Sequence, residues 1–145
     1  MKGLIQRVKR ASVTIDVKVY SKINQGILIF LGVEKGDNEQ NADKLADKLC
    51  KLRIFEDEDG KMNKSILDVN GEILIVSQFT LAGDCKKGTR PSFDKAELPQ
   101  RANELYEYFV DLIKQKNIPV GTGVFGAMMD VELVNDGPVT FMLEF

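Results

Sequence analysis

Three stretches of this sequence place hydroxyl, amide, arginine and glycine residues where they could do chemistry: "SQFTLA" at 77–82, "GTRPSF" at 88–93 and "GVFGAMMDVELVNDGPVT" at 123–140. The first stretch ends an apolar run, so Ser77, Gln78 and Thr80 occupy the polar end of an expected buried strand, a common place for a site. Each stretch also has a structural interpretation, because hydroxyls satisfy strand-end backbone groups and glycines suit tight turns. Taken singly, none of the three identifies a reaction.

Histidine is absent from all 145 residues, and its absence limits the available chemistry. It excludes Ser-His-Asp and Cys-His nucleophile systems, His-ligated zinc or iron, and the commonest general acid or base near neutral pH. Thr80 could accept an acyl group only if a base took its proton, and "IVSQFTLAG" contains neither histidine nor lysine. Any catalysis must therefore use something else.

The overall charge argues against a broad basic face that would hold nucleic acid. The net charge is -2 and the pI about 5.3, whereas phosphate affinity grows with the number of Lys and Arg contacts. Only a local cluster of Lys86, Lys87 and Arg90 remains, which leaves open a non-catalytic module that binds an RNA end. The longest uncharged apolar run, "GILIFLGV" at 26–33, is too short to span a bilayer. Without a signal peptide at the N-terminus, a cytoplasmic location is expected.

Several segments have the periodicity of strands and helices that would position these residues. Alternating residues predict a half-buried strand near 13–19, while "GILIFLGV" and "EILIVSQFTL" at 72–81 predict central strands. Apolar stripes predict helices over 38–51 and 99–116, the first capped by Asp37 or Asn38. The sequence predicts a single α+β domain over residues 1–145. We expect it to be β-barrel-like, a mostly antiparallel sheet with two packed helices.

The C-terminal segment "ELVNDGPVTFMLEF" divides into two strand-like runs at residues 135–138. Asn, Asp, Gly and Pro each favour a reversal of the chain for separate steric reasons, so local rules predict a turn here. The same rules say nothing about a chemical role for Gly137 and Pro138.

Together, in this order, the motifs resemble those of the D-aminoacyl-tRNA deacylases, formerly called D-Tyr-tRNA(Tyr) deacylases. The resemblance rests on "SQFTL", "GxRPSF", "FGAxM" and "NDGPVT", and extends to "RVKRASV" and "LRIFEDEDGKMNKS" at 52–65. It covers essentially the whole chain. It implies a homodimeric enzyme that hydrolyses the ester between a D-amino acid and the terminal adenosine of tRNA. Glycine mischarged on tRNA(Ala) is an implied further substrate, and no metal or organic cofactor is expected.

The resemblance also implies the residues of the site. Ser77, Gln78, Phe79 and Thr80 would line the pocket for the terminal adenosine and the ester, with Ala102 and Phe125 bounding it. Arg7 would brace the pocket wall. Ala102 fits equally well as an ordinary residue of the helix stripe.

Two mechanisms are compatible with the family resemblance. One makes Thr80 the nucleophile of an esterase, and the other is assisted by the 2'-hydroxyl of the terminal ribose, with the protein supplying orientation and backbone donors. Only the second needs no titrating side chain.

Gly137 and Pro138 would form a Gly-cisPro pair that enters the partner subunit's pocket. Such cis bonds are found in roughly 5% of X-Pro bonds in folded proteins. The carbonyl oxygens of the pair would face the substrate α-ammonium, and this rigid backbone would reject the side chain of an L-amino acid.

Overall fold

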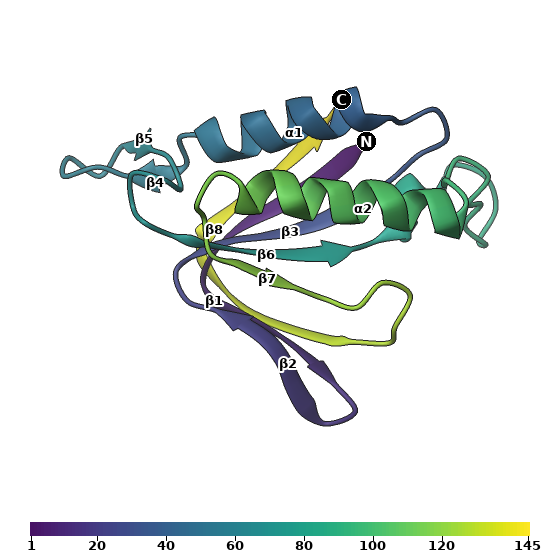
Figure 1. Cartoon of the computed structure of the whole chain (residues 1–145), viewed down its shortest axis with the longest axis horizontal. Coiled ribbons are helices and arrows are strands. Elements are labelled where there is room, and N and C mark those ends of the chain that lie inside the picture. The colour runs from purple at the N-terminus through teal and green to yellow at the C-terminus, as the bar shows by residue number, and fades with distance from the viewer.

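The computed structural model describes residues 1–145 and contains one curved sheet with two helices packed on one face (Figure 1). The main sheet has six strands, and a small two-stranded sheet lies beside the end of the first helix. The elements in chain order are β1 (Lys2–Ile15), β2 (Lys18–Ile23), β3 (Gly26–Gly32), α1 (Glu39–Lys51), β4 (Phe55–Glu56), β5 (Met62–Lys64), β6 (Glu72–Ser77), the 3-10 helix η1 (Phe79–Ala82), α2 (Pro99–Lys114), β7 (Val120–Thr122) and β8 (Asp130–Glu144).

The sheet confirms the predicted α+β, β-barrel-like class. Its strand order is β2-β1-β3-β6-β7, with β8 also paired to β1. β1 runs antiparallel to β2, β3 and β8, whereas β3–β6 and β6–β7 are parallel, so the sheet is mixed. The Ser21 hydroxyl on β2 donates to the Thr122 carbonyl on β7 at 2.5 Å, so the first and last strands of this order approach each other and nearly close the barrel.

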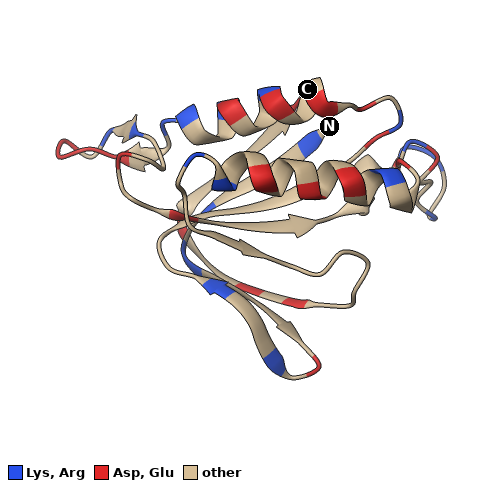
Figure 2. Cartoon of the chain, viewed as in Figure 1, with Lys and Arg blue, Asp and Glu red and all other residues tan.

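Both helices form where the apolar stripes predict them. Asn38 caps α1 by accepting from the Gln40 N–H, and the Asn41 side chain accepts from the Asn38 N–H in return. α2 begins at Pro99, whose missing N–H costs nothing at the first helical position. The apolar stripes of α1 and α2 join the apolar residues of β3 and β6 in one core, while charged side chains mark the outward faces (Figure 2). No helix of the structure is long and apolar enough to cross a membrane.

The predicted reversal at residues 135–138 is wrong. β8 continues through it as one strand, pairing with β1 on both sides of register shifts between Gln6 and Arg10. The irregular residues 135–138 lie where the ladder is interrupted, so the turn-forming side chains produce a bulge instead of a hairpin. Local propensity misses this because the pairing partner, β1, is more than 100 residues away in the sequence.

The second central strand is shorter than its apolar run. β6 ends at Ser77, and residues 79–81, predicted to extend it, lie in η1 instead. The Gln78 N–H still donates to the Leu31 carbonyl at 2.8 Å, after which the chain turns over the end of β3. A Cβ on Gly32 would lie 2.9 Å from the Leu81 Cβ, so this turn requires the close approach of a glycine. The turn presents the "SQFT" residues at the edge of the sheet.

Candidate active site

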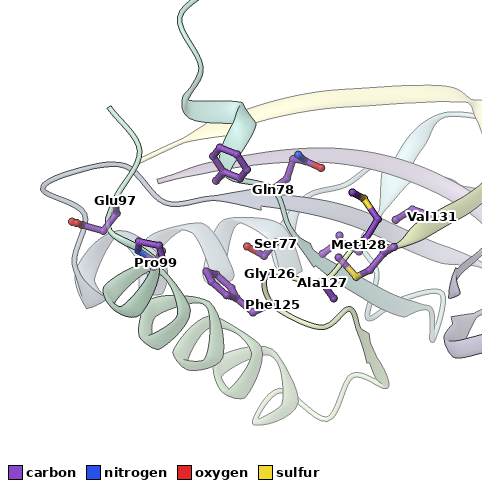
Figure 3. Close-up of a pocket in the computed structure, with 13 residues that line it drawn as sticks. Ser77, Gln78, Glu97, Pro99, Phe125, Gly126, Ala127, Met128 and Val131 are labelled. Atoms are coloured by element: carbon purple, nitrogen blue, oxygen red, sulfur yellow. The ribbon is translucent and has the colours of Figure 1, made fainter. Parts of the chain in front are cut away.

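A cavity of about 580 Å³ opens between the end of β6, the start of α2 and the loop before β8 (Figure 3). Its lining is predominantly apolar, with few polar side chains, as expected for a site that takes a ligand with a flat or aliphatic part. The lining residues are Val76, Ser77, Gln78, Phe79, Glu97, Pro99, Ala102, Phe125, Gly126, Ala127, Met128, Met129 and Val131.

Five of the residues expected in the site line this one cavity although they come from three distant segments. Ser77, Gln78 and Phe79 arrive from the end of β6 and the start of η1. Ala102 lies on the first turns of α2, only 8% exposed, so its small side chain leaves space there. Phe125 lies between α2 and the end of β6 (Figure 3).

Thr80 does not line the cavity. It lies on η1 as an exposed residue, and its hydroxyl accepts a hydrogen bond from the Gln78 side-chain amide at 2.5 Å. No lysine or carboxylate forms a hydrogen bond with this hydroxyl, so nothing takes its proton and it remains a weak nucleophile. The arrangement suits a residue that orients Gln78.

Two backbone donors at the edge of the cavity are unused. The N–H groups of Phe79 and Thr80, the first two of η1, donate to no acceptor in the protein, as expected at a helix start. The preceding N–H, of Gln78, is taken by the Leu31 carbonyl. The site therefore offers N–H groups that could face a developing oxyanion without a titrating side chain.

Glu97, which sequence reasoning did not identify, is the one ionisable side chain in the lining. Its carboxylate accepts from the Leu98 N–H at 2.7 Å, just before α2 begins. Only its place beside the first helical proline, Pro99, could have indicated it. Of the other unassigned lining residues, 126–129 lie within the "FGAxM" motif, whereas Val76, Pro99 and Val131 lie outside it.

Tyr106 supports the cavity from behind. Its ring lies 6.1 Å from that of Phe125, centroid to centroid, and its hydroxyl donates to the Ile75 carbonyl at 2.8 Å. Burial raises the pKa of Tyr106 to about 12, so the phenol stays neutral and keeps donating at physiological pH. No group of three or more Cys, Asp and Glu side chains is arranged to hold a metal ion.

Gly137 and Pro138 lie outside this cavity. Both are exposed, the bond between them is cis, and Gly137 has a φ of 124°, in a region that disfavours side chains. A Cβ on Gly137 would lie 2.9 Å from Val139 Cγ2 and 3.3 Å from an Arg7 guanidinium nitrogen. The pair is therefore held in a fixed backbone geometry on the surface.

Arg7 holds this segment in place, and the expectation that it braces the wall of this cavity is wrong. It is 4% exposed and lies among the residues of the bulge instead of in the lining. Its guanidinium donates to the Asp136 carbonyl at 3.1 Å and to the Ile54 carbonyl at 2.5 Å, and it pairs with the Asp136 carboxylate at 3.2 Å. Because these bonds use several edges of one planar fork, they fix direction as well as distance.

Comparison with known proteins assigns the family. The family model for D-Tyr-tRNA(Tyr) deacylase matches residues 4–144. The chain belongs to this family. A D-aminoacyl-tRNA deacylase of Geotalea daltonii is 58% identical over 99% of this chain and 96% of its own. One of Aquifex aeolicus is 57% identical over 99% of this chain and 97% of its own.

Solved structures share the fold of this deacylase-family chain. A structure titled "c-Myc DNA Unwinding Element Binding Protein" superimposes with a TM-score of 0.95 at 41% identity, covering 100% of this chain and 99% of the other. A probable eukaryotic D-amino acid tRNA deacylase gives a TM-score of 0.84 at 17% identity, over 99% and 98% of the two chains, a likeness of fold alone.

Proposed function

We propose that the chain is a hydrolase that cleaves the ester of D-aminoacyl-tRNA to free D-amino acid and tRNA. Family membership over residues 4–144 supports the activity. One observation supports a location for this activity: the "SQF" residues, Ala102 and Phe125 line the same largely apolar cavity. We assign Ser77, Gln78, Phe79, Ala102 and Phe125 to the binding of the terminal adenosine and the ester.

The reaction proposed here is assisted by the substrate's own 2'-hydroxyl. The cavity holds no side chain with the partners of an activated nucleophile, and Thr80 points to Gln78 instead of to a base. The free N–H groups of Phe79 and Thr80 are suited to stabilise the oxyanion that forms as water attacks the ester carbonyl. Positioning and backbone donors would then supply the rate enhancement, as they can without proton transfer to the protein.

Removal of the Thr80 hydroxyl separates this mechanism from a Thr80-nucleophile esterase. Thr80→Ala keeps the backbone N–H, so we expect it to retain at least about a tenth of the wild-type kcat, the scale of a lost orienting contact. D-Tyr-tRNA ending in 2'-deoxyadenosine should be nearly inert. An inactive Thr80→Ala variant, together with wild-type enzyme that hydrolyses the 2'-deoxy substrate at the normal rate, would contradict the proposal.

The chiral filter is proposed to come from a second copy of the chain. Gly137 and Pro138 are exposed and absent from their own chain's cavity, which supports a contact with a substrate held in another subunit. Their carbonyl oxygens would accept hydrogen bonds from the substrate α-ammonium and block the direction of an L side chain. Glycine has no side chain to block, so Gly-tRNA(Ala) is included among the proposed substrates.

The outer edge of β8 is suited to this homodimer. β8 pairs only with β1, so its other edge has free backbone groups, and exposed apolar residues lie near its end: Phe141, Met142 and Phe145. Apolar side chains on a free sheet edge favour association with another chain. Light scattering on the purified protein should give twice the mass of 16.2 kDa. A monomer would contradict the cross-subunit filter but not the hydrolysis.

The cytoplasm, where tRNA is charged, is the proposed location. Hydrolysis of D-Tyr-tRNA, L-Tyr-tRNA and Gly-tRNA separates this function from its alternatives. A deacylase of this kind releases D-tyrosine and glycine, a general esterase releases L-tyrosine as well, and a non-catalytic module that binds tRNA ends releases nothing.

A further inference from the structure

A basic hairpin, residues 84–95, lies beside the first turn of α2 (at the right of Figure 1). Asp84 and Ser92 exchange backbone hydrogen bonds of 2.8 and 3.0 Å that close it. It contains four cationic side chains, Lys86, Lys87, Arg90 and Lys95, and two carboxylates, Asp84 and Asp94, a local charge of +2 (4 − 2) in a chain whose net charge is -2. The rest of the chain is therefore distinctly acidic.

The hairpin is fixed to the cavity by contacts at its base. The ring of Phe93 lies 5.0 Å from that of Phe79, centroid to centroid, and Phe79 lines the cavity. The Lys95 carbonyl accepts from the Lys35 N–H at 2.9 Å, which ties the other end to the loop after β3. Two residues further on, Glu97 reaches the cavity lining. A ligand that leaves the cavity beside Phe79 therefore meets the hairpin next.

The cationic side chains of the hairpin are not paired with acidic side chains of the protein. Lys86, Lys87, Arg90 and Lys95 are exposed and form no ion pair. The two carboxylates, by contrast, bind their own hairpin: Asp84 accepts from the Lys86 N–H at 2.8 Å and Asp94 from the Ser92 hydroxyl at 2.8 Å.

Two shallow hollows of about 420 and 310 Å³ flank the hairpin. They share Asp84, Lys86 and Lys95 in their linings, and the smaller one is lined by polar residues only. Their polar and charged linings distinguish these hollows from the apolar cavity. They are suited to a charged, hydrated ligand instead of an aromatic one.

We propose that the basic hairpin binds the phosphodiester groups of the RNA strand whose 3'-terminal nucleotide occupies the cavity. The inference rests on the proposed function, which places a terminal adenosine in the cavity with a phosphate-linked strand leading away from it. Exposed, unpaired ammonium and guanidinium groups are the usual ligands of such phosphates, and they need no base sequence.

The surroundings favour the same path. The alternative path along the exposed face of α2 offers no unpaired cation: Arg101 pairs with Glu104 and Lys114 with Asp111, while Glu107 forms no ion pair and would repel a phosphate. The hairpin thus explains how a protein with a net negative charge can still hold a polyanionic substrate at one end. Affinity for the strand would come from this local contact, while the choice of ester stays with the cavity.

Two substrates separate phosphate binding from the reaction itself. D-Tyr-tRNA carries the phosphate strand, whereas 3'-D-tyrosyl-adenosine carries the same ester and adenosine without any phosphate. The variant Lys86→Ala/Lys87→Ala/Lys95→Ala removes three contacts. The matched control, Lys44→Ala/Lys48→Ala/Lys61→Ala, removes the same charge from exposed lysines that form no ion pair on α1 and the β4–β5 hairpin.

The salt dependence of kcat/KM between 50 and 200 mM salt gives the readout. Each phosphate contact on a single strand contributes about 0.7 to the slope of log kcat/KM against log salt concentration. With three contacts, kcat/KM of the wild type on D-Tyr-tRNA should therefore fall about twentyfold more over this range than kcat/KM of the hairpin variant. At low salt the hairpin variant should have a lower kcat/KM than the wild type on D-Tyr-tRNA but not on 3'-D-tyrosyl-adenosine. The control variant should follow the wild type on both substrates.

The proposal is overturned if the hairpin variant keeps the wild-type salt slope on D-Tyr-tRNA, or if the control variant loses as much of that slope. It is also overturned if the hairpin variant lowers kcat/KM equally on D-Tyr-tRNA and on 3'-D-tyrosyl-adenosine. If the wild type hydrolyses neither ester, the proposed function fails instead. The same variants are then compared by the salt dependence of the Kd for uncharged tRNA. An unchanged slope in the hairpin variant overturns the phosphate site, and a slope lower by about 2 supports it.

Discussion

Arg7 donates a hydrogen bond from its Nε to the backbone carbonyl of Asp136 at 3.1 Å, the residue directly before Gly137. This bond joins a buried position of β1 to the exposed segment that we propose to read chirality. The Gly-Pro pair therefore lies on a rigid support although it is on the surface.

Removal of Arg7 should affect both stability and activity. Arg7→Ala leaves the Ile54 and Asp136 carbonyls without their donor and the Asp136 carboxylate without its partner. We expect a loss of about 3 kcal/mol in the free energy of unfolding, measured with urea. Arg53→Ala is the control, because exposed Arg53 also donates to a backbone carbonyl, that of Asn63, and should cost at most about 1 kcal/mol.

Arg7→Lys keeps the charge but not the planar fork. If the fork positions the Gly-Pro pair, Arg7→Lys should lower kcat/KM on D-Tyr-tRNA at temperatures where it is fully folded. A folded Arg7→Lys enzyme with wild-type kcat/KM would argue that Arg7 acts on stability alone.

Gly137→Ala tests the backbone geometry of the filter. The added Cβ would lie 2.9 Å from Val139 Cγ2 at a φ of 124°, so the segment must shift. We expect kcat on D-Tyr-tRNA to fall at least about tenfold, because a misplacement near 1 Å already costs more than this. Gly60→Ala, at a φ of 73° with nothing within 4 Å, should keep wild-type kcat. Equal effects of the two substitutions would deny a special role to Gly137.

Ala102→Leu tests whether the cavity binds the substrate. The side chain would extend into the cavity, so we expect KM for D-Tyr-tRNA to rise while the free energy of unfolding changes by less than about 1.5 kcal/mol. Ala46→Leu provides the contrast: Ala46 is 1% exposed in the core, where added volume costs about 1–3 kcal/mol without changing KM. A rise in KM for both variants would point to general damage.

Titration of the buried Tyr106 should lower the stability of the protein at alkaline pH. Its pKa is raised from 10.0 to about 12 by burial, so the unfolded chain releases the proton first as the pH rises. Its contribution is fully present below pH 10 and is lost between about pH 10 and 12, at most about 2–3 kcal/mol. Urea unfolding across this range should show a shallower decline for Tyr106→Phe than for the wild type. Parallel curves would show that Tyr106 does not titrate in this way.

The elements that follow from local pattern were predictable, and those that depend on distant pairing were not. The stripe from Ala42 to Cys50 and the cap at Asn38 predict α1 to within a residue. Residues 135–138 mislead, because their side chains favour a turn while β1 holds them in a strand. Thr80 was predicted to belong to a strand and lies on η1, since the apolar run does not show where β6 leaves the sheet.

The candidate site was predictable only through the family motifs. Ala102 and Phe125 are ordinary apolar residues by periodicity, and only the fold brings them beside Ser77. Glu97 lies outside every motif, and its place depends on how the hairpin joins α2. The pairing of Arg7 with Asp136 depends on the register of β1 against β8, which no local pattern encodes.

The most direct test of the account is the initial rate of deacylation of D-Tyr-tRNA and L-Tyr-tRNA by the wild-type protein under identical conditions. We predict release of D-tyrosine with kcat/KM at least about a hundredfold above that for the L-ester, because a steric filter rejects only one of the two enantiomers. Equal rates on the two esters, or no release of D-tyrosine, would contradict it.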